Sequence, residues 1–314
     1  MQIRYGVVGT GALGGYYGGM LARAKKDVHF LFRSDYEFVR KNGLRVDSVK
    51  GDFHLTQVQA CADTSAMPKC DVVLVCIKTT GNANLPELLR PILHSGTTVL
   101  LLQNGLGVEE DLAAALPGVG IAGGLAFICS QKNGHGHIHH LDYGNLDIGS
   151  YNVKDESVLA QVVEDFNAAG VSAELAADLA FARWRKLVWN VPFNGLTVVM
   201  NTTTDKLVTH EAMRELVREI MLEVIHGANA VGVPLRDALV QKMIDYTLGM
   251  TPYAPSMKLD YDHRRPMEIE YIYAKPISAA AKAGFSMHRI AMLETQLRFL
   301  QDHMYKANKS MNRV

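Results

Sequence analysis

Six residues near the N-terminus have the types and spacing of a phosphate-binding loop. Gly9, Thr10, Gly11, Ala12, Leu13 and Gly14 form a GxGxxG pattern between a predicted strand and a predicted helix. The first glycine permits a tight turn, the second admits a pyrophosphate, and the third lets helix and strand pack closely. The phosphates would meet the unpaired N–H groups of the helix N-terminus. The pattern predicts a dinucleotide site, with a ligand-free glycine turn as the alternative.

The end of the next predicted strand indicates which dinucleotide binds. Arg33 follows it, about 20 residues beyond the last glycine, where an acidic residue would hold the ribose hydroxyls of NAD. A guanidinium pairs instead with a 2′-phosphate in bidentate fashion, so Arg33 and the hydroxyl of Ser34 favour NADP(H). The neighbouring Asp35 keeps NAD open as the alternative, and a solvated surface arginine is the structural one.

A third group of polar residues has helical spacing. Lys186, Asn190 and Asn194 lie at i, i+4 and i+8, which places them on one helix face. Apolar residues such as Trp184 and Leu187 surround them, and amides in an apolar setting are costly unless something binds them. A lysine and two amides in a row suit a small anionic substrate, to which the lysine would donate a proton. The alternative is a polar stripe facing water.

The first half of the chain alternates strand and helix patterns, which predicts a doubly wound, mostly parallel sheet with helices. The run 71–77 shows no polar alternation and is typical of a buried parallel strand. The segment 44–60 alternates around a Gly-Asp pair and predicts an antiparallel excursion. We predict strands at 3–8, 28–32, 71–77 and 97–102, and helices at 12–24 and 83–93.

Strand patterns stop after about residue 175, so we predict two domains, an α/β dinucleotide-binding domain at 1–175 and an all-α substrate domain at 176–314. Pro276 should bend the fourth of the expected helices. These helices are predicted at 180–200, 209–231, 235–250, 267–283 and 288–306.

Composition excludes several classes of protein. Hydrophobic residues make up 48% of the 314 and charged residues 20%, as in ordinary globular proteins. With 32 basic and 32 acidic residues, the chain has no basic field for nucleic acid. We expect no signal peptide and no membrane span. Four scattered cysteines favour a reducing, cytoplasmic setting. A homodimer is left open.

Four histidines cluster at 135, 137, 139 and 140, and their spacing is compatible with a metal site. No cysteine or second ligand cluster lies beside them, so we predict a hairpin with solvated histidines and no metal. Cys76 and Cys129 lie in apolar strands and are interpreted as packing residues.

Taken together, the chain resembles the ketopantoate reductase (2-dehydropantoate 2-reductase) family nearly from end to end. Beyond the glycine loop, the likeness rests on motifs in matching order: Ile77-Lys78-Thr79, Gln103-Asn104-Gly105, Trp184–Leu187 with Asn190 and Asn194, Ser256-Met257 with Asp260, and Arg265-Pro266 before Glu268-Ile269. The resemblance implies a Rossmann-type domain, a helical domain and NADPH-dependent reduction of a 2-keto acid.

The resemblance also implies roles for individual residues. Lys186 is similar to the general acid that protonates the carbonyl oxygen, and Glu268 to the carboxylate that binds the substrate hydroxyl and orients the lysine. Asn190, Asn194 and Ser256 would hold the rest of the acid, and Lys78 and Asn104 would lie beside the nicotinamide half of the cofactor. We expect these groups to meet in a cleft between the domains.

Three departures keep alternatives open. Arg33 is a single basic residue where some relatives carry more, Pro192 should kink the helix between the two asparagines, and Met267 replaces a threonine that many relatives carry. The first alternative is a β-hydroxyacid or opine-type dehydrogenase with the same two domains, using NAD or another acid. The second is a non-catalytic NADP-sensing protein.

Overall fold

The computed structural model describes residues 2–250, 252 and 254–311. The chain forms two compact units: Met1–Gln103 with Val108–Leu179, and Asn104–Gly107 with Ala180–Val314. The second unit thus includes four residues from the middle of the first half, as well as the C-terminal part.

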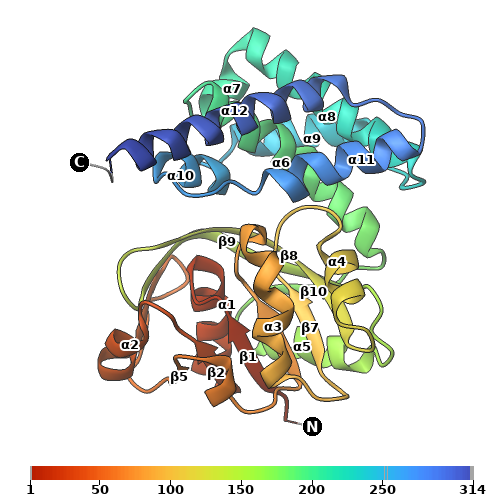
Figure 1. Ribbon diagram of the computed structural model, residues 1–314. Helices are drawn as coiled ribbons and strands as arrows, with labels where there is room; N and C mark the ends of the chain where they lie inside the picture. The colour runs from red at the N-terminus through yellow and green to blue at the C-terminus, as the bar shows by residue number, and fades with distance from the viewer. Residues whose placement is uncertain (1, 251, 253, 312–314) are drawn as a thin grey trace. The chain divides into compact units, whose positions relative to one another are not determined.

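The first unit contains one mixed, largely parallel sheet with the strand order β4-β3-β9-β8-β7-β6-β1-β2-β5, and β10 also pairs with β9 (Figure 1). The strands from β8 to β5 in this order all run parallel, which confirms the predicted doubly wound sheet. The strands are β1 (Arg4–Val8), β2 (Asp27–Leu31), β3 (Leu44–Ser48), β4 (Phe53–Leu55), β5 (Gln59–Cys61), β6 (Val72–Val75), β7 (Thr98–Leu101), β8 (Gly120–Lys132), β9 (His137–Ser150) and β10 (Ala173–Leu175).

β1 lies at the point where the strand order reverses. Its neighbours are β2 on one side and β6 on the other, and ligands of such sheets bind at the carboxyl ends of the strands beside this point. All four residues of β6 are buried, as its unbroken apolar run predicts. β1 leads directly into the glycine loop, so the fold places that loop at the ligand-binding edge.

Antiparallel pairs occupy the other side of the sheet. β3 and β4 pair as predicted, but β5 joins the parallel part beside β2. β8 and β9 form a long hairpin, and β3 also pairs parallel with β9. The helices of this unit are α1 (Ala12–Arg23), α2 (Tyr36–Asn42), α3 (Leu85–Leu89), α4 (Val108–Ala115) and α5 (Ser157–Ala168), and its 3-10 turns are η1 (Thr64–Ala66), η2 (Thr79–Asn84) and η3 (Arg90–Ile92).

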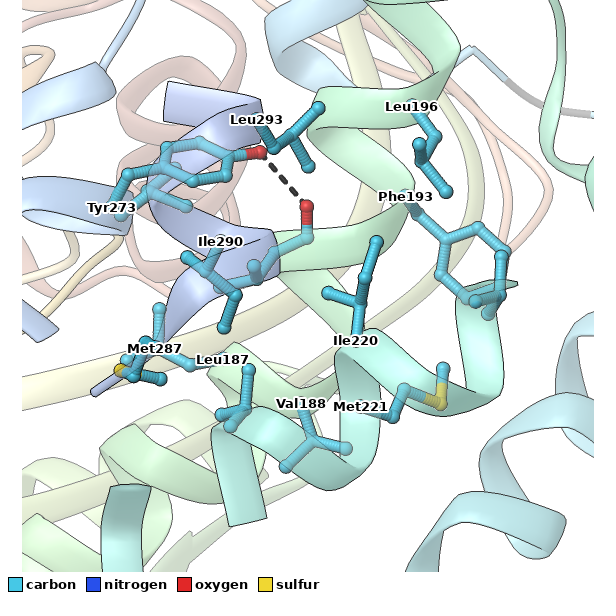
Figure 2. Close-up of a cluster of buried hydrophobic side chains, with 14 of the residues drawn as sticks. Leu187, Val188, Phe193, Leu196, Ile220, Met221, Tyr273, Met287, Ile290 and Leu293 are labelled. Atoms are coloured by element: carbon cyan, nitrogen blue, oxygen red, sulfur yellow. Dashed lines mark hydrogen bonds between the residues drawn. The ribbon is translucent and has the colours of Figure 1, made fainter. Parts of the chain in front are cut away.

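All regular secondary structure in the described part of the second unit is helical, as predicted. Its elements are α6 (Leu179–Val199), α7 (Thr204–Thr209), α8 (Glu211–Ala230), α9 (Ala238–Leu248), α10 (Ser256–Asp262), the π-helix η4 (Glu270–Ala274), α11 (Lys275–Lys282) and α12 (His288–Met311). The core of this unit forms where α6, α8 and α12 meet, and Figure 2 shows Val188, Ile220 and Ile290 from these three helices.

Three local predictions were wrong in detail. The segment 83–93 contains only the short helix α3 between two 3-10 turns, because Pro86 lies in its first turn and Pro91, two residues after its end, cannot continue it. The helix predicted from residue 267 begins later, with a π-helical turn before Pro276, which has no N–H for a regular turn. His140 is completely buried rather than solvated: its ring contacts Ser48 and lies 4.2 Å from the Tyr16 ring.

No helix in the described part of the chain has the length and apolar character needed to cross a membrane.

Candidate functional site

The glycine loop has the backbone of a dinucleotide site. Gly9 has φ +101°, and a Cβ on it would lie 2.5 Å from the Ile77 nitrogen. A Cβ on Gly14 would lie 2.3 Å from the Gly9 carbonyl oxygen, so no side chain fits at either position. A Cβ on Gly11 would have no heavy atom within 4 Å. The loop is therefore closed where helix and strand pack and open where a phosphate would approach.

The N-terminus of α1 fits an anion. Among the described residues the N-cap Gly11 supplies no side-chain cap, so the backbone N–H groups of the first turn are left to an anion at this end of the helix. The Thr10 hydroxyl donates a hydrogen bond of 2.8 Å to the Leu31 carbonyl, which ties the loop to the end of β2. These features fit the pyrophosphate of a dinucleotide cofactor.

Two predicted cofactor residues follow the strands on either side of β1. Arg33 comes after β2 and is exposed, and Lys78 comes after β6 and is half-buried. Since β6, β1 and β2 are parallel neighbours, their loops share one edge of the sheet. Gln103, for which no role was predicted, holds the loop after β6: its Nε2 donates to the Ile77 carbonyl at 2.9 Å and to Asn82 Oδ1 at 2.6 Å.

Asp35, the residue that kept NAD open, is 2% exposed and fully engaged. Its carboxylate oxygens contact Lys132 Nζ at 2.6 Å and His135 Nδ1 at 2.9 Å, and they accept a hydrogen bond of 3.0 Å from the Gly136 N–H. Burial alone would raise the pKa of Asp35, but the hydrogen bonds from Lys132, the Gly136 amide and His135 together lower it to about 2. Both carboxylate oxygens already accept hydrogen bonds from the protein, so this side chain is not available to bind the ribose hydroxyls of NAD.

The polar stripe of α6 is buried, not solvated. Lys186 is 9% exposed, Asn190 6% and Asn194 2%, within a helix whose other inward residues belong to the core. Asn194 Oδ1 accepts a hydrogen bond of 3.4 Å from the Met257 N–H. This contact places the start of α10, and with it the half-buried Ser256, next to the stripe.

The side chain of Asn190 makes no hydrogen bond to another residue in the described part of the chain. In that same part, only the Tyr16 hydroxyl is fully enclosed and without a partner. The Asn190 amide therefore reaches space that solvent or a ligand can enter, although the residue is almost entirely buried. This is the condition expected of an amide that binds a ligand.

Pro192 leaves the stripe intact. α6 continues through it to Val199, and Asn194 stays on the buried face. In the turn around the proline, the Tyr273 hydroxyl donates a hydrogen bond of 2.9 Å to the Val191 carbonyl (Figure 2). Asn194 therefore stays buried in α6 despite the proline.

Glu268 is 6% exposed and lies just before the π-helix η4. π-helical turns occur frequently at functional sites. The segment leading to it is held by Asp260, whose side chain accepts from Arg265 Nε at 2.9 Å and whose carbonyl accepts from the Arg265 N–H. Met267 is 3% exposed and packs in the helical core, so its apolar side chain is explained by packing.

Asn104 belongs to the short segment that groups with the second unit. The next residues fix this segment: the Leu106 N–H donates to the Tyr271 carbonyl at 2.8 Å, and a Cβ on Gly105 would lie 2.5 Å from that same oxygen. The glycine is therefore required by the close approach. Asn104 follows β7 in the chain, and its neighbours are held by η4. It stays a predicted cofactor residue.

The structure groups the candidate residues in two sets. The first unit carries the glycine loop, Arg33 and Lys78, and the second carries Asn104, Lys186, Asn190, Asn194, Ser256 and Glu268. No group of three or more His, Cys, Asp or Glu side chains in the described residues has the arrangement of a metal site.

Comparisons with known proteins place the whole chain in one context. The family model described as "Ketopantoate reductase PanE/ApbA" matches residues 5–153, and its C-terminal counterpart matches residues 178–301. A 2-dehydropantoate 2-reductase of Nostoc is 51% identical over 95% of both chains. The crystal structure of a 2-dehydropantoate 2-reductase from Geobacter metallireducens is 42% identical, with TM-score 0.91 over 94% of this chain and 99% of that one. One from Methylococcus capsulatus is 31% identical, with TM-score 0.88 over 96% and 98%.

Proposed function

The chain belongs to the ketopantoate reductase family, and we propose that it catalyses the NADPH-dependent reduction of 2-dehydropantoate (ketopantoate) to pantoate. The observation that carries the proposal is the buried Lys186–Asn190–Asn194 stripe on α6, whose middle amide has no partner among the described residues. A buried cation with two amides suits a small anion bearing a carbonyl group. A protein that only senses NADP has no use for a buried proton donor.

NADPH is the proposed cofactor, and when bound it supplies the hydride. The glycine loop and the uncapped start of α1 would hold the pyrophosphate. Arg33 would pair with the 2′-phosphate, which its exposed position after β2 allows. Lys78 and Asn104 would border the nicotinamide half. The contacts of Asp35 with Lys132, His135, the Gly136 N–H and the Ser34 hydroxyl support NADPH over NADH.

Lys186 is the proposed general acid. Hydride addition builds negative charge on the carbonyl oxygen, and a buried ammonium group both offsets this charge and donates the proton that completes the hydroxyl. Glu268 would accept a hydrogen bond from the hydroxyl of the substrate. Asn190, Asn194 and Ser256 would hold the remaining polar atoms, through amide and hydroxyl groups that bind carboxylate without adding charge.

The test is a substrate panel. Purified protein is mixed with 2-dehydropantoate, 2-oxoisovalerate, pyruvate and phenylpyruvate, each with NADPH and with NADH, and the loss of nicotinamide absorbance is followed. We expect the highest kcat/KM for 2-dehydropantoate with NADPH. A higher value for another 2-keto acid, or for NADH, would reassign the enzyme to a related dehydrogenase. No turnover of any acid, with tight NADPH binding, would leave the sensing protein as the function.

We also propose a cytoplasmic location, which four free cysteines support.

A further inference from the structure

A lysine and a histidine from a distant hairpin contact the carboxylate of Asp35, two residues after Arg33. Lys132 ends β8 and His135 follows in the turn before β9, about 100 residues from Asp35 in the chain. Both contact the Asp35 carboxylate, and Asp35 is only two residues beyond Arg33. Lys132 keeps 34% of its side chain exposed and His135 keeps 61%, so both also face the solvent around this loop.

Ser34 joins this cluster to the cofactor position. Its hydroxyl donates a hydrogen bond of 3.1 Å to Asp35 Oδ1. Its single proton is thus engaged, and a phosphate would be held by Arg33, two residues before the buried carboxylate of Asp35. A carboxylate near the phosphate would repel it unless a nearby cation neutralises the carboxylate.

We propose that Lys132, assisted by His135, is a specificity-determining residue for the phosphorylated cofactor: it neutralises Asp35, so that Arg33 acts on the 2′-phosphate without an opposing charge. This inference rests on the proposed function, since it presupposes NADPH at Arg33. Lys132 is a positioning residue that works through Asp35, and the ligand it selects is the 2′-phosphoadenosine part of the dinucleotide.

A purely structural role for the same contacts makes a different forecast. If Lys132 and Asp35 only fastened the hairpin to the loop after β2, their loss would weaken both cofactors alike. If they set the charge at the phosphate, their loss would change NADPH binding and leave NADH binding as it was. The ratio of the two dissociation constants therefore separates the explanations.

The experiment measures NADPH and NADH binding to the full chain by fluorescence titration. Lys132→Met should weaken NADPH binding about five- to tenfold and change NADH binding less than twofold. Lys132→Arg should keep the preference because it keeps the charge. The matched control is Lys69→Met, which removes an exposed lysine just before β6, at the opposite edge of the sheet, and should change neither.

The opposite substitution supplies a second measurement. Asp35→Asn removes the buried negative charge and should strengthen NADPH binding severalfold, with NADH unchanged. The double variant Asp35→Asn/Lys132→Met should return to within about threefold of the wild-type preference. The double variant can be measured even if Lys132→Met alone is too unstable, because it contains no unpaired buried carboxylate.

Equal weakening of both cofactors by Lys132→Met, or a double variant no better than the single, would overturn the inference. Arg33→Asp is the reference arm: it should weaken NADPH strongly and spare NADH. If Arg33→Asp shifts the preference and Lys132→Met does not, this inference falls and the cofactor assignment stands. If neither shifts it, the assignment of NADPH to Arg33 itself is wrong.

Discussion

Asn190 is 6% exposed, and its side chain forms no hydrogen bond within the described part of the chain. Removing an amide fully from water without a partner costs roughly 1–3 kcal/mol, and Asn190 bears the part of that cost set by the water contact it loses. Asn229 on α8 is the contrasting case, because its side chain bonds both the N–H and the carbonyl of Leu235. Its amide stabilises the fold, whereas that of Asn190 remains available to a ligand.

The same substitution at the two asparagines should therefore have opposite effects. Asn190→Leu should raise the free energy of unfolding by about 1 kcal/mol and raise KM for the keto acid at least tenfold. Asn229→Leu should lower the free energy of unfolding and leave KM unchanged. Urea denaturation and steady-state kinetics check both. A destabilised Asn190→Leu with normal KM would show that the amide serves the fold.

Asp35 should make stability depend on pH in the acid range. Its pKa is about 2 in the folded chain and about 4 in an unfolded one. The ionised form is thus favoured by folding, and the contribution is fully present above pH 4 and disappears as pH falls towards 2. The free energy of unfolding of the wild type should exceed that of Asp35→Asn by roughly 2 kcal/mol at pH 7. Urea unfolding at pH 7, 4 and 3 should show this difference shrinking, and a constant difference would contradict the assignment.

Among the secondary elements, α6 and η4 depend on each other. Pro192 removes one backbone donor from the middle of α6, and the Tyr273 hydroxyl of η4 binds the carbonyl of the preceding residue, Val191. The tyrosine is completely buried, so this hydrogen bond forms away from water. It holds the helix of the polar stripe against the turn that follows Glu268.

Removing that hydroxyl should loosen the pair of elements. Tyr273→Phe should lower the free energy of unfolding by about 1–2 kcal/mol and reduce kcat several-fold, because the bond joins α6, which carries Lys186, to η4, which follows just after Glu268. Tyr261→Phe is the control, since the Tyr261 hydroxyl has no hydrogen bond among the described residues. Denaturation curves and kinetics on both variants decide. Equal stability of the two would show that the Tyr273 hydrogen bond contributes nothing.

The sequence predicts those secondary elements that depend on interactions between neighbouring residues. The buried run of β6, the glycine turn after β1 and the long helices α6, α8 and α12 all follow from patterns of neighbouring residues. The hairpin of β8 and β9 was predicted only around its turn, because glycines at 120, 123 and 124 weaken the strand pattern. Nothing local shows that β3 pairs with β9, which lies about 90 residues further along the chain.

The candidate site divides in the same way. Helical spacing was enough to place Lys186, Asn190 and Asn194 on one face, since i+4 neighbours share a face by geometry alone. The partners of Asp35 could not be found, because Lys132 and His135 reach it only through the sheet. The burial of His140 was missed for a similar reason: Ser48 and Tyr16 surround it from separate segments.

For the molecule as a whole, cofactor binding and proton donation are assigned to different compact units. Lys186 belongs to the second unit and the glycine loop to the first. Lys186→Ala should lower kcat roughly 10²–10⁴-fold, the range of general acid catalysis, while NADPH affinity changes less than twofold. Lys186→Arg should restore little of the lost kcat, since a guanidinium group does not give up its proton. Glu268→Ala should raise KM as well as lower kcat.

Stopped-flow kinetics and NADPH titration on these three variants check the assignment. Near-normal kcat in Lys186→Ala would transfer the donor role to water or to another side chain. A large loss of NADPH affinity in the same variant would show that Lys186 binds cofactor rather than substrate.

The four residues Asn104–Gly107 have a consequence for anyone who recombines this chain with its relatives. Their contacts lie with η4, although their position in the sequence is inside the first unit. A chimera with one junction near residue 175 would take Tyr271 from one parent protein and the loop 104–107 from the other. The exchangeable block is therefore discontinuous: residues 104–107 have to travel with residues 180 onward, so a functional swap takes three junctions rather than one.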